Sequence, residues 1–317
     1  FTVTNGKGIE WTSSAFDRAG GGIYMADGMS PTISNCFIRN NICTDNCIGA
    51  GIMVYSGSPI IENCIIENNT TEKGQGGGIY IEGGSNTNVN ISRTIIRNNY
   101  ADFEGGGIFS NNEFELVNSY VYDNVCARGS EIFASGIPLI INSTLYQTKA
   151  SSSTYMLFNN AGDVNIFNSI LWSTSGAQVF KNPDSDIFLS NSIILGGWTG
   201  VGSGNIASDP QLNTSTLKIE NTSPAIGAGV SSILINSQTY NAPSTDYFGA
   251  TRPYPDGTNP DIGAYEDSLG TPFVDTTAPT VTLSPANGAA AVSVNSNITI
   301  TFNEAVRNID DSNLSDT

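Results

Sequence analysis

The sequence predicts an all-β fold: a right-handed parallel β-helix, in which short strands wind into stacked coils, followed by the start of an Ig-like β-sandwich. Three observations predict it. A motif recurs at intervals of one coil, apolar residues alternate on both sides of a recurrent asparagine, and 34 of 317 residues are glycine, above the usual share of about 7%. Frequent glycine and asparagine are typical of many short strands joined by tight turns.

The repeat is clearest in residues 22–41 and 51–69, which read almost alike. Weaker copies follow, and all can be aligned on the residue that precedes a small side chain, which we call the anchor. Successive anchors are 23 to 30 residues apart, the length of one three-stranded coil, with the variation assigned to loops. The anchors are Asn35, Asn63, Arg93, Asn118, Asn142, Asn168 and Asn191.

Two apolar columns flank the anchor, one two positions before it and one three positions after it. Because side chains alternate between the faces of a strand, this spacing predicts two short strands whose inward residues fill one core. Asparagine suits the bend between them because it tolerates the left-handed backbone region. The columns are Ile33, Ile61, Ile91, Leu116, Ile140, Ile166, Leu189 and Ile38, Ile66, Ile96, Val121, Leu145, Leu171, Ile194. Directly after the anchor stand small residues, as a tight corner requires: Cys36, Cys64, Thr94, Ser119, Ser143, Ser169 and Ser192.

A third strand follows the glycine-rich run of each coil and carries two adjacent apolar columns, one aliphatic and one mainly aromatic. Neighbouring residues of a strand face opposite ways, so one column must point away from the core. Two interpretations stay open. The aromatic column either stacks internally, or forms an exposed ladder in which Tyr24 and Tyr80 contact polysaccharide through ring and hydroxyl.

A second outward column begins with Arg39, Glu67 and Arg97, which we interpret as an alternating charge ladder on a solvated face. The column continues as Tyr122, Tyr146 and Trp172, and so much apolar surface is rarely left bare. Either residues 205–266 fold back and cover it, or it is a sugar-stacking platform or partner surface. Tyr122, Tyr146 and Trp172 are therefore carbohydrate-binding candidates, together with Tyr24 and Tyr80.

Several motifs resemble those of bacterial surface proteins. The Gly-Gly-Gly-Ile-Tyr and Asn-Cys-x-Ile-x-x-Asn signatures resemble right-handed β-helix repeats, including those of polymorphic outer-membrane proteins. Residues 223–229 (Ser-Pro-Ala-Ile-Gly-Ala-Gly) and 261–266 (Asp-Ile-Gly-Ala-Tyr-Glu) resemble the closing region of surface proteins called choice-of-anchor Q. Residues 276–306 resemble the first strands of an S-layer-type Ig-like domain. The residues of this segment are too few to close a β-sandwich.

This resemblance implies an extracellular location at a bacterial cell surface and three parts. Residues 1–204 form a parallel β-helix that is truncated at its N-terminal end, because residue 1 already lies in a strand-and-turn pattern. Residues 205–270 form a closing region packed on the last coils, and residues 271–317 form a linker and an incomplete Ig-like domain. We expect the chain to be part of a longer polypeptide.

A cluster of charged residues marks the closing region. Asp246, Asp261 and Glu266 lie near Arg252 in the sequence. They could supply hard oxygen ligands to Ca²⁺, or form a salt bridge and turn caps that seal the last coil. Otherwise we expect no cofactor.

Charge and cysteine content exclude several kinds of partner. The net charge of −17, with 29 acids, 12 bases and no histidine, argues against nucleic acid and anionic lipid as partners. The apolar runs are too short for membrane insertion as a helix. A zinc site is not expected without histidine or a second close cysteine pair. Cys43 and Cys47 are spaced for a local disulfide, although free cysteine also behaves as a small buried hydrophobe.

The catalytic signal is weak. No two of the lysines recur at one position on neighbouring coils, and a serine triad is excluded because no histidine is present. We therefore expect a non-catalytic adhesin or stalk that presents a rigid β-helix to glycans or partner proteins. The alternative is a Ca²⁺-dependent polysaccharide lyase or another carbohydrate-active enzyme.

Overall fold

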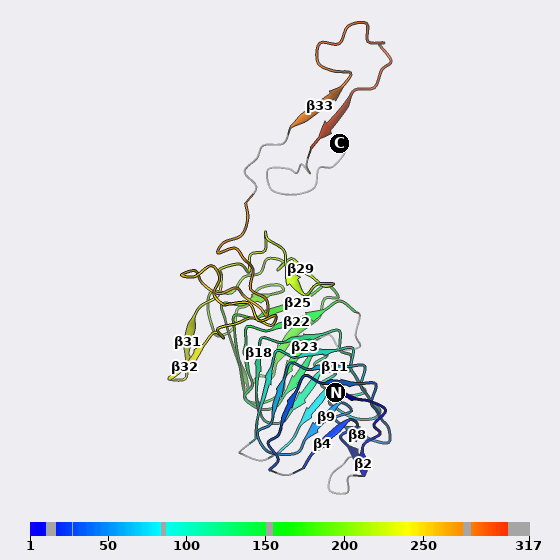
Figure 1. Cartoon of the computed structure of the whole chain (residues 1–317), viewed down its shortest axis with the longest axis vertical. Coiled ribbons are helices and arrows are strands. Elements are labelled where there is room, and N and C mark those ends of the chain that lie inside the picture. The colour runs from blue at the N-terminus through cyan, green and yellow to red at the C-terminus, as the bar shows by residue number, and fades with distance from the viewer. Residues whose placement is uncertain (11–16, 27, 84–86, 150–154, 275–279, 304–317) are drawn as a thin grey trace. The chain divides into compact units, whose positions relative to one another are not determined.

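The computed structural model describes residues 1–10, 17–26, 28–83, 87–149, 155–274 and 280–303. The chain divides into two compact units, Phe1–Phe273 and Val274–Thr317. The first unit is a right-handed solenoid of short parallel strands (Figure 1). Its all-β class was predicted correctly from the sequence.

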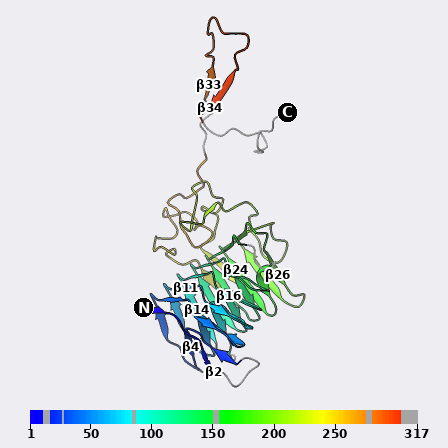
Figure 2. The ribbon, with the colours of Figure 1, turned by 90° about the vertical axis from the view of Figure 1, so that its right-hand side faces the viewer.

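Three parallel sheets run along the solenoid, and each takes one strand from each successive coil (Figure 2). Within the described residues, sheet 1 contains β1 (Thr2–Val3), β6 (Phe37–Arg39), β11 (Ile65–Glu67), β15 (Ile95–Arg97), β19 (Tyr120–Tyr122), β22 (Thr144–Gln147), β25 (Ile170–Ser173) and β28 (Ile193–Ile194). Sheet 2 contains β5 (Thr32–Ser34), β10 (Ile60–Glu62), β14 (Asn88–Ser92), β18 (Glu113–Val117), β21 (Leu139–Ile141), β24 (Asp163–Phe167) and β27 (Asp186–Ser190). Sheet 3 contains β4 (Ile23–Met25), β9 (Ile52–Val54), β13 (Ile79–Ile81), β17 (Ile108–Ser110), β20 (Ile132–Ala134), β23 (Tyr155–Asn159) and β26 (Gln178–Lys181).

Two smaller sheets add to the N-terminal coils. One contains β7 (Ile42–Cys43), β12 (Thr70–Thr71) and β16 (Tyr100–Ala101). The other contains β2 (Ile9–Glu10), β3 (Arg18–Ala19) and β8 (Cys47–Ile48).

The apolar columns fill the interior, as predicted. Ile61 and its equivalents in the column before the anchor are fully buried, except Ile33, which is partly buried at the N-terminal end. The column after the anchor is also buried throughout, and the strand pairing places Ile66 directly between Ile38 and Ile96. Neighbouring strands of a sheet lie about 4.8 Å apart, so equivalent residues of successive coils stack at this spacing.

The bend at the anchor is confirmed. All seven anchors have positive φ, between 42° and 54°, the left-handed region that asparagine enters more readily than most residues. The small residues beside them form a hydrogen-bond ladder in which the main-chain N–H of one coil donates to the hydroxyl of the next. Ser119 N donates to Ser143 Oγ at 3.2 Å, and Ser143 N donates to Ser169 Oγ at 3.1 Å.

A buried asparagine ladder was not predicted. It consists of Asn41, Asn69, Asn99 and Asn124, and each amide nitrogen donates to the side-chain oxygen of the next coil at 2.8–2.9 Å. The ladder ends on Glu131, whose Oε2 accepts from Asn124 Nδ2 at 2.6 Å. Glu131 is fully buried, and desolvation raises the pKa of this carboxyl well above its usual value.

The aromatic column of sheet 3 stacks internally, which decides between the two interpretations. It points away from the solenoid interior but forms a second buried cluster with Ile48 and Ala19. Tyr80, Phe109 and Phe133 stack with ring centroids 4.7 and 5.1 Å apart. A glycine before β4, β9, β13 and β17 permits this cover: Gly105 has a φ of +63°, and a Cβ there would lie 2.6 Å from Phe109 Cβ.

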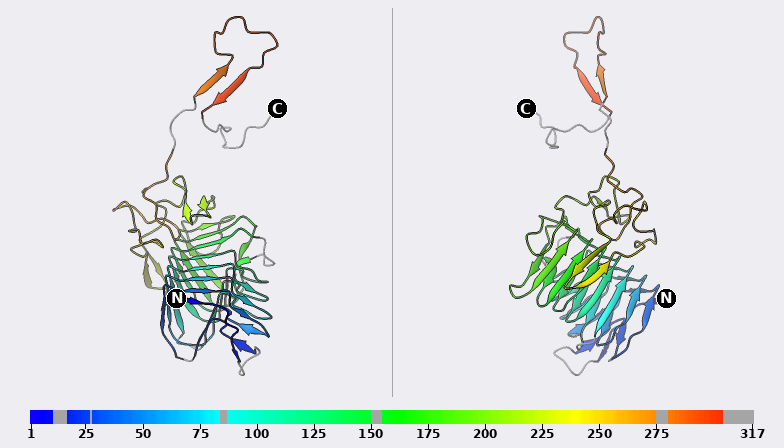
Figure 3. Two further views of the ribbon diagram at one scale, coloured as in Figure 1. Left: turned by 45° about the vertical axis from the view of Figure 1, so that its right-hand side comes forward. Right: turned by 90° about the vertical axis from the view of Figure 1, so that its left-hand side faces the viewer.

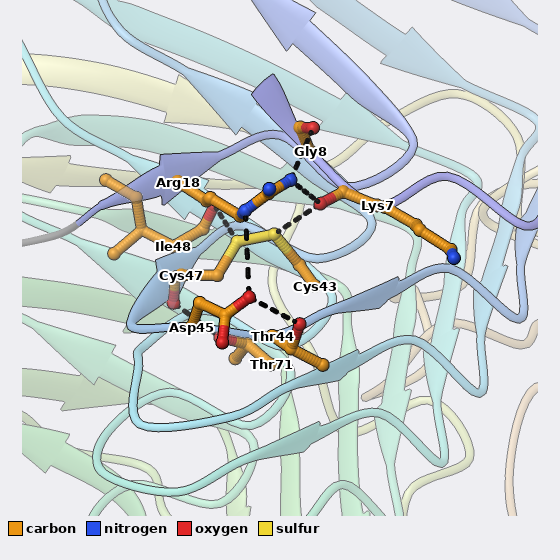
Figure 4. The surroundings of a disulfide bond; sticks show 9 residues. All are labelled: Lys7, Gly8, Arg18, Cys43, Thr44, Asp45, Cys47, Ile48 and Thr71. Atoms are coloured by element: carbon orange, nitrogen blue, oxygen red, sulfur yellow. Dashed lines mark hydrogen bonds and ion pairs between the residues drawn. A yellow bond between two sulfur atoms is a disulfide. The ribbon is translucent and has the colours of Figure 1, made fainter. Parts of the chain in front are cut away.

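A disulfide joins Cys43 and Cys47, at the ends of the loop between β7 and β8, with the Cα atoms 5.6 Å apart. Figure 4 shows its surroundings. Arg18 donates to the carbonyl oxygens of Lys7 and Gly8, at 3.3 and 3.4 Å. The disulfide thus lies in a small buried cluster of its own.

The closing region (residues 205–270) wraps the corner between sheets 1 and 2 on the C-terminal coils (Figure 3). Ile219, Ile226 and Ile262 pack on the outer face of sheet 1 against Ile170 and Trp172. The strands of this region are β29 (Leu212–Asn213), β30 (Lys218–Ile219), β31 (Ser232–Ile235) and β32 (Gln238–Asn241).

The hairpin β31–β32 covers sheet 2, because Ile233 and Tyr240 pack against Leu139, Ile141 and Phe167. The closing region also lies over Tyr146 and Trp172 of the outward apolar column on sheet 1.

The anchor asparagines hold the closing region at the corner. Asn118 Nδ2 donates to Thr245 O at 2.6 Å, and Asn142 Nδ2 donates to Asp261 O at 3.0 Å. Asn168 both donates to Val230 O and accepts from Val230 N. The same column that bends the chain in every coil thus also binds the segment that covers it.

The second unit contains a pair of antiparallel strands, β33 (Val281–Ser284) and β34 (Thr299–Phe302). Residues 275–279 and 304–317, which the Ig-like prediction includes in part, lie outside the described residues. Among the described residues, no helix has the length and apolarity to span a membrane.

Candidate functional site

The aromatic candidates from the sequence lie in different environments. Tyr80 is 2% exposed and its hydroxyl donates to Glu82, whereas Tyr24 is only half-buried. An exposed ladder running along sheet 3 is therefore wrong as an account of Tyr80. Tyr146 and Trp172 are 8% and 9% exposed, because the closing region lies over them.

The acidic cluster of the closing region is a set of turn caps around one buried salt bridge. Asp246 accepts from Ala250 N and Glu266 N, and Asp261 accepts from Gly227 N and Asp267 N. All six carboxylate oxygens of Asp246, Asp261 and Glu266 thus accept a hydrogen bond from the chain itself.

Arg252 completes that cluster. Its Nε donates to Glu266 Oε2 at 2.8 Å, and both side chains are fully buried. Burial and the nearby Glu266 carboxylate raise the pKa of Asp261 to about 7. The described residues contain no group of three carboxylate, histidine or cysteine side chains placed to hold a metal ion. The geometry favours the structural interpretation of these acids over a Ca²⁺ site.

The charge ladder is present and ends on a tyrosine. Glu67 lies between Arg39 and Arg97, at 3.7 and 2.8 Å. Arg97 also donates to the hydroxyl of Tyr122 at 2.8 Å and lies 5.9 Å from that ring centroid. Glu67 is buried and Arg97 is half-buried, so of these three residues only Arg39 lies on the solvated face that the sequence predicts. Tyr122 is also half-buried, and the predicted tyrosine column starts where the charge ladder meets the closing region.

A tyrosine-lined pocket of about 170 Å³ lies where β19 and β22 meet the hairpin β29–β30. Tyr120, Tyr122 and Tyr146 line it, together with a single carboxylate, Asp123. Both oxygens of Asp123 accept hydrogen bonds from Thr148. The pocket brings together two of the predicted tyrosines, Tyr122 and Tyr146. Its carboxylate, Asp123, is used to cap the loop at Thr148.

A wider groove lies at the corner of the N-terminal coils, and we call it the corner groove. Its volume is about 300 Å³. Phe37 and Ile65, on the outer face of sheet 1, provide apolar surface, and the closing region contributes Tyr247. The remaining lining residues come from the corner itself: Asn35, Cys36, Asn63 and Arg93.

The polar groups of the corner groove are partly unpaired. Arg93 Nε donates to Asn63 Oδ1 at 2.9 Å, and its guanidinium lies 3.6 Å from Glu62. The structure gives no partner among the described residues to the side-chain amide of Asn35. Phe37 is 42% exposed. The groove therefore offers an accessible ring, amide donors and acceptors, and a guanidinium.

Tyr247 is fixed by aromatic contacts. Its ring meets that of Tyr120 edge-to-face at 5.1 Å and that of Phe248 at 4.9 Å. Burial raises the pKa of the Tyr247 hydroxyl, so the group is a neutral donor at physiological pH. Phe37 and Tyr247, which line the groove, are not among the candidate residues predicted from the sequence.

The described residues do not bring together a catalytic set in the tyrosine pocket or in the corner groove. Glycoside hydrolysis requires two carboxyl groups about 5–9.5 Å apart, whereas the corner groove has no carboxylate in its described lining and the tyrosine pocket has one. Of the lysines, Lys149 binds Asn98 Oδ1 at 2.5 Å and Lys181 pairs with Asp186 at 3.2 Å. Neither lysine lines a hollow.

Two parts of the chain match known families. Residues 2–145 match the model described as a right handed beta helix region, and residues 275–317 match the model described as a bacterial Ig-like domain. No curated protein and no solved structure gives a significant match. The strand register continues the same coils beyond residue 145 to Ile194. Both kinds of domain are typical of surface or secreted proteins, and the chain is consistent with a surface or carbohydrate-related protein.

Proposed function

We propose that this chain is a non-catalytic, glycan-binding part of a bacterial cell-surface protein. In this proposal the β-helix is a rigid scaffold and the corner groove is its binding site. The ligand is a glycan rather than nucleic acid or lipid, because a net charge of −17 repels both polyanions and anionic membranes.

The corner groove is the observation that carries the proposal. Sugars present an apolar face of C–H groups and a rim of hydroxyls that both donate and accept hydrogen bonds. Phe37 and Tyr247 supply ring surface for the apolar face of a sugar. Asn35, Asn63 and Arg93 supply hydrogen-bonding groups for its hydroxyls. Few polar groups placed around an apolar surface are typical of small-molecule sites.

A scaffold role fits the packing of the solenoid. Its interior is filled by stacked aliphatic columns, and its corners are fixed by serine and asparagine ladders that run across successive coils. Such ladders hold neighbouring strands in one register, so residues of the groove that come from different coils keep fixed distances. Preformed sites bind with a smaller entropy cost than mobile ones.

No specific observation favours the alternative of a Ca²⁺-dependent lyase. Asp246, Asp261 and Glu266 bind their own main chain, and the described lining of the corner groove contains no lysine. Arg93 is the one base there, and it is paired with Asn63 and Glu62.

The test is a glycan array probed with the intact chain and with Phe37→Ala. The exposed ring of Phe37 contributes little to the core, so this variant keeps its melting temperature while losing roughly fivefold to tenfold in affinity for the glycans that bind. Phe103→Ala is the matched control, because Phe103 is also an exposed ring (47%) but lies away from the groove lining. Equal loss in both variants, or binding to proteins but to no glycan, would refute the proposal.

A further inference from the structure

A third hollow lies within the closing region, and we call it the closing-region pocket. Its volume is about 350 Å³, and three aromatic rings line it: Phe248, Tyr254 and Tyr265. Phe248 and Tyr265 meet edge-to-face at 5.9 Å and 84°. Phe248 and Tyr254 are 49% and 50% exposed, so ring surface is open to a ligand.

Lys218 brings the one unpaired cation of this pocket. Its Nζ lies 5.3 Å from the centroid of Phe248 and 5.2 Å from that of Tyr265. Cation–π attraction to two rings fixes the ammonium beside the pocket. Among the described residues it has no carboxylate or hydrogen-bond acceptor, so its N–H donors are free for a ligand.

Asp267 supplies the complementary acceptor. Its Oδ1 accepts from Leu269 N at 3.0 Å, while its Oδ2 has no partner among the described residues. The other two acids of the lining, Asp246 and Glu266, use all their oxygens to cap turns and to bind Arg252. The pocket therefore combines open ring faces, one free charged donor and one free acceptor.

The charge balance around the pocket selects the ligand. Arg252 is neutralised by Glu266, which leaves Lys218 facing Asp246 and Asp267. An anionic sugar would meet an excess of negative charge here, and a cationic ligand would compete with Lys218 for the two rings. A neutral sugar meets neither obstacle, because its hydroxyls can accept from the ammonium and donate to the carboxylate.

We propose that the closing-region pocket binds a neutral sugar residue, stacked on Tyr254 and hydrogen-bonded to Lys218 and Asp267. This inference rests on the glycan-binding function proposed above and adds a second site to it. The volume of the pocket suits one or two sugar rings and lies at the lower end of the range of about 300–1,000 Å³ that is typical of small-molecule pockets.

The experiment is calorimetric titration of the intact chain carrying Phe37→Ala, so that the corner groove is weakened and the closing-region pocket dominates. The probes are cellotriose, maltotriose, mannotriose and chitotriose as neutral sugars, and trigalacturonate as the anionic one. At least one neutral trisaccharide is expected to bind in this background. Adding Tyr254→Ala or Lys218→Gln should weaken that binding roughly fivefold to tenfold.

Tyr100→Ala is the matched control, since Tyr100 is a similarly exposed ring (40%) on β16, outside the pocket. Tyr254→Phe should keep most of the affinity if the ring face is what binds. Unchanged affinity in Tyr254→Ala, tighter binding of trigalacturonate, or no binding of any neutral probe in the Phe37→Ala background would overturn the inference. Wild-type binding that disappears with Phe37→Ala alone would leave the proposed function standing and remove only the second site.

Discussion

Replacing Arg252 with methionine should release the closing region from the β-helix. Arg252 donates through Nε to Glu266 at 2.8 Å, through one terminal nitrogen to Asn118 Oδ1 at 2.6 Å, and through the other to Gly263 O at 3.0 Å. It thus binds Glu266 and Gly263 of the closing region as well as Asn118, an anchor of the solenoid.

The magnitude follows from burial. Both partners of the Arg252–Glu266 pair have fully buried side chains, and removal of one member of a buried pair costs about 3–5 kcal/mol because the other charge is left uncompensated. Glu266 would keep its hydrogen bonds from Tyr254 N and Asp261 N, which places the expected loss toward the lower end. A loss of about 3 kcal/mol corresponds to a roughly 100-fold change in an opening equilibrium.

Amide hydrogen exchange measures that opening directly. Amides of the closing region should exchange roughly 100-fold faster in Arg252→Met, while those of sheet 3 change little. Arg39→Met is the control, because Arg39 is 44% exposed and pairs with Glu67 at 3.7 Å, and such surface pairs contribute less than about 1 kcal/mol. Adding Glu266→Gln to Arg252→Met should recover part of the loss. Exchange rates unchanged by Arg252→Met would refute this account of the buried pair.

Three further predictions concern the solenoid. Ile66→Asp should lower the free energy of unfolding by several kcal/mol, because it places an unpaired charge among stacked aliphatic residues; an unchanged melting temperature would contradict the register. Gly105→Ala should destabilise more than Gly28→Ala, since both have positive φ but only the first would bring a Cβ to 2.6 Å from Phe109; thermal melting of both variants separates backbone strain from the clash. Glu131 should make the chain more stable as pH falls, because its pKa is raised by burial: its contribution is full below the unfolded-state pKa of about 4.5 and is lost as pH rises through the higher folded-state pKa. Melting temperatures between pH 5 and 9 should therefore depend less on pH in Glu131→Gln, and equal slopes in the two proteins would exclude this origin.

The periodic part of the fold could be predicted because each coil repeats the same physical requirement. Ile66 stacks on Ile38 and Ile96, so the seven side chains of one column occupy nearly identical environments and show the same apolar preference in the sequence. The bend at the anchors could be predicted for a similar reason, because asparagine recurs where the backbone has positive φ. The buried ladder from Asn41 to Asn124 carried the same signal, six residues after each anchor, and could have been found by extending the alignment.

The non-periodic contacts could not be predicted in this way. Glu131 ends the asparagine ladder from a different position of the coil, so no column contains it. Tyr247 reaches a groove lined by Phe37, although the two lie far apart in the sequence. Their proximity depends on the path of the closing region over the corner, which the turn caps of Asp246 and Asp261 determine. Turn caps around a salt bridge were one of the two interpretations that the sequence left open for these acids, but the sequence did not show which main-chain N–H groups they bind.

The central claim is that this chain binds glycans without cleaving them. The most direct test is to incubate the purified chain, with and without millimolar Ca²⁺, with the glycan that it binds most tightly, and to analyse the recovered glycan by mass spectrometry. The account predicts that the glycan is recovered intact after many times the lifetime of the complex. Shortened or unsaturated products that accumulate with the wild-type chain, and fail to accumulate with Phe37→Ala, would contradict it.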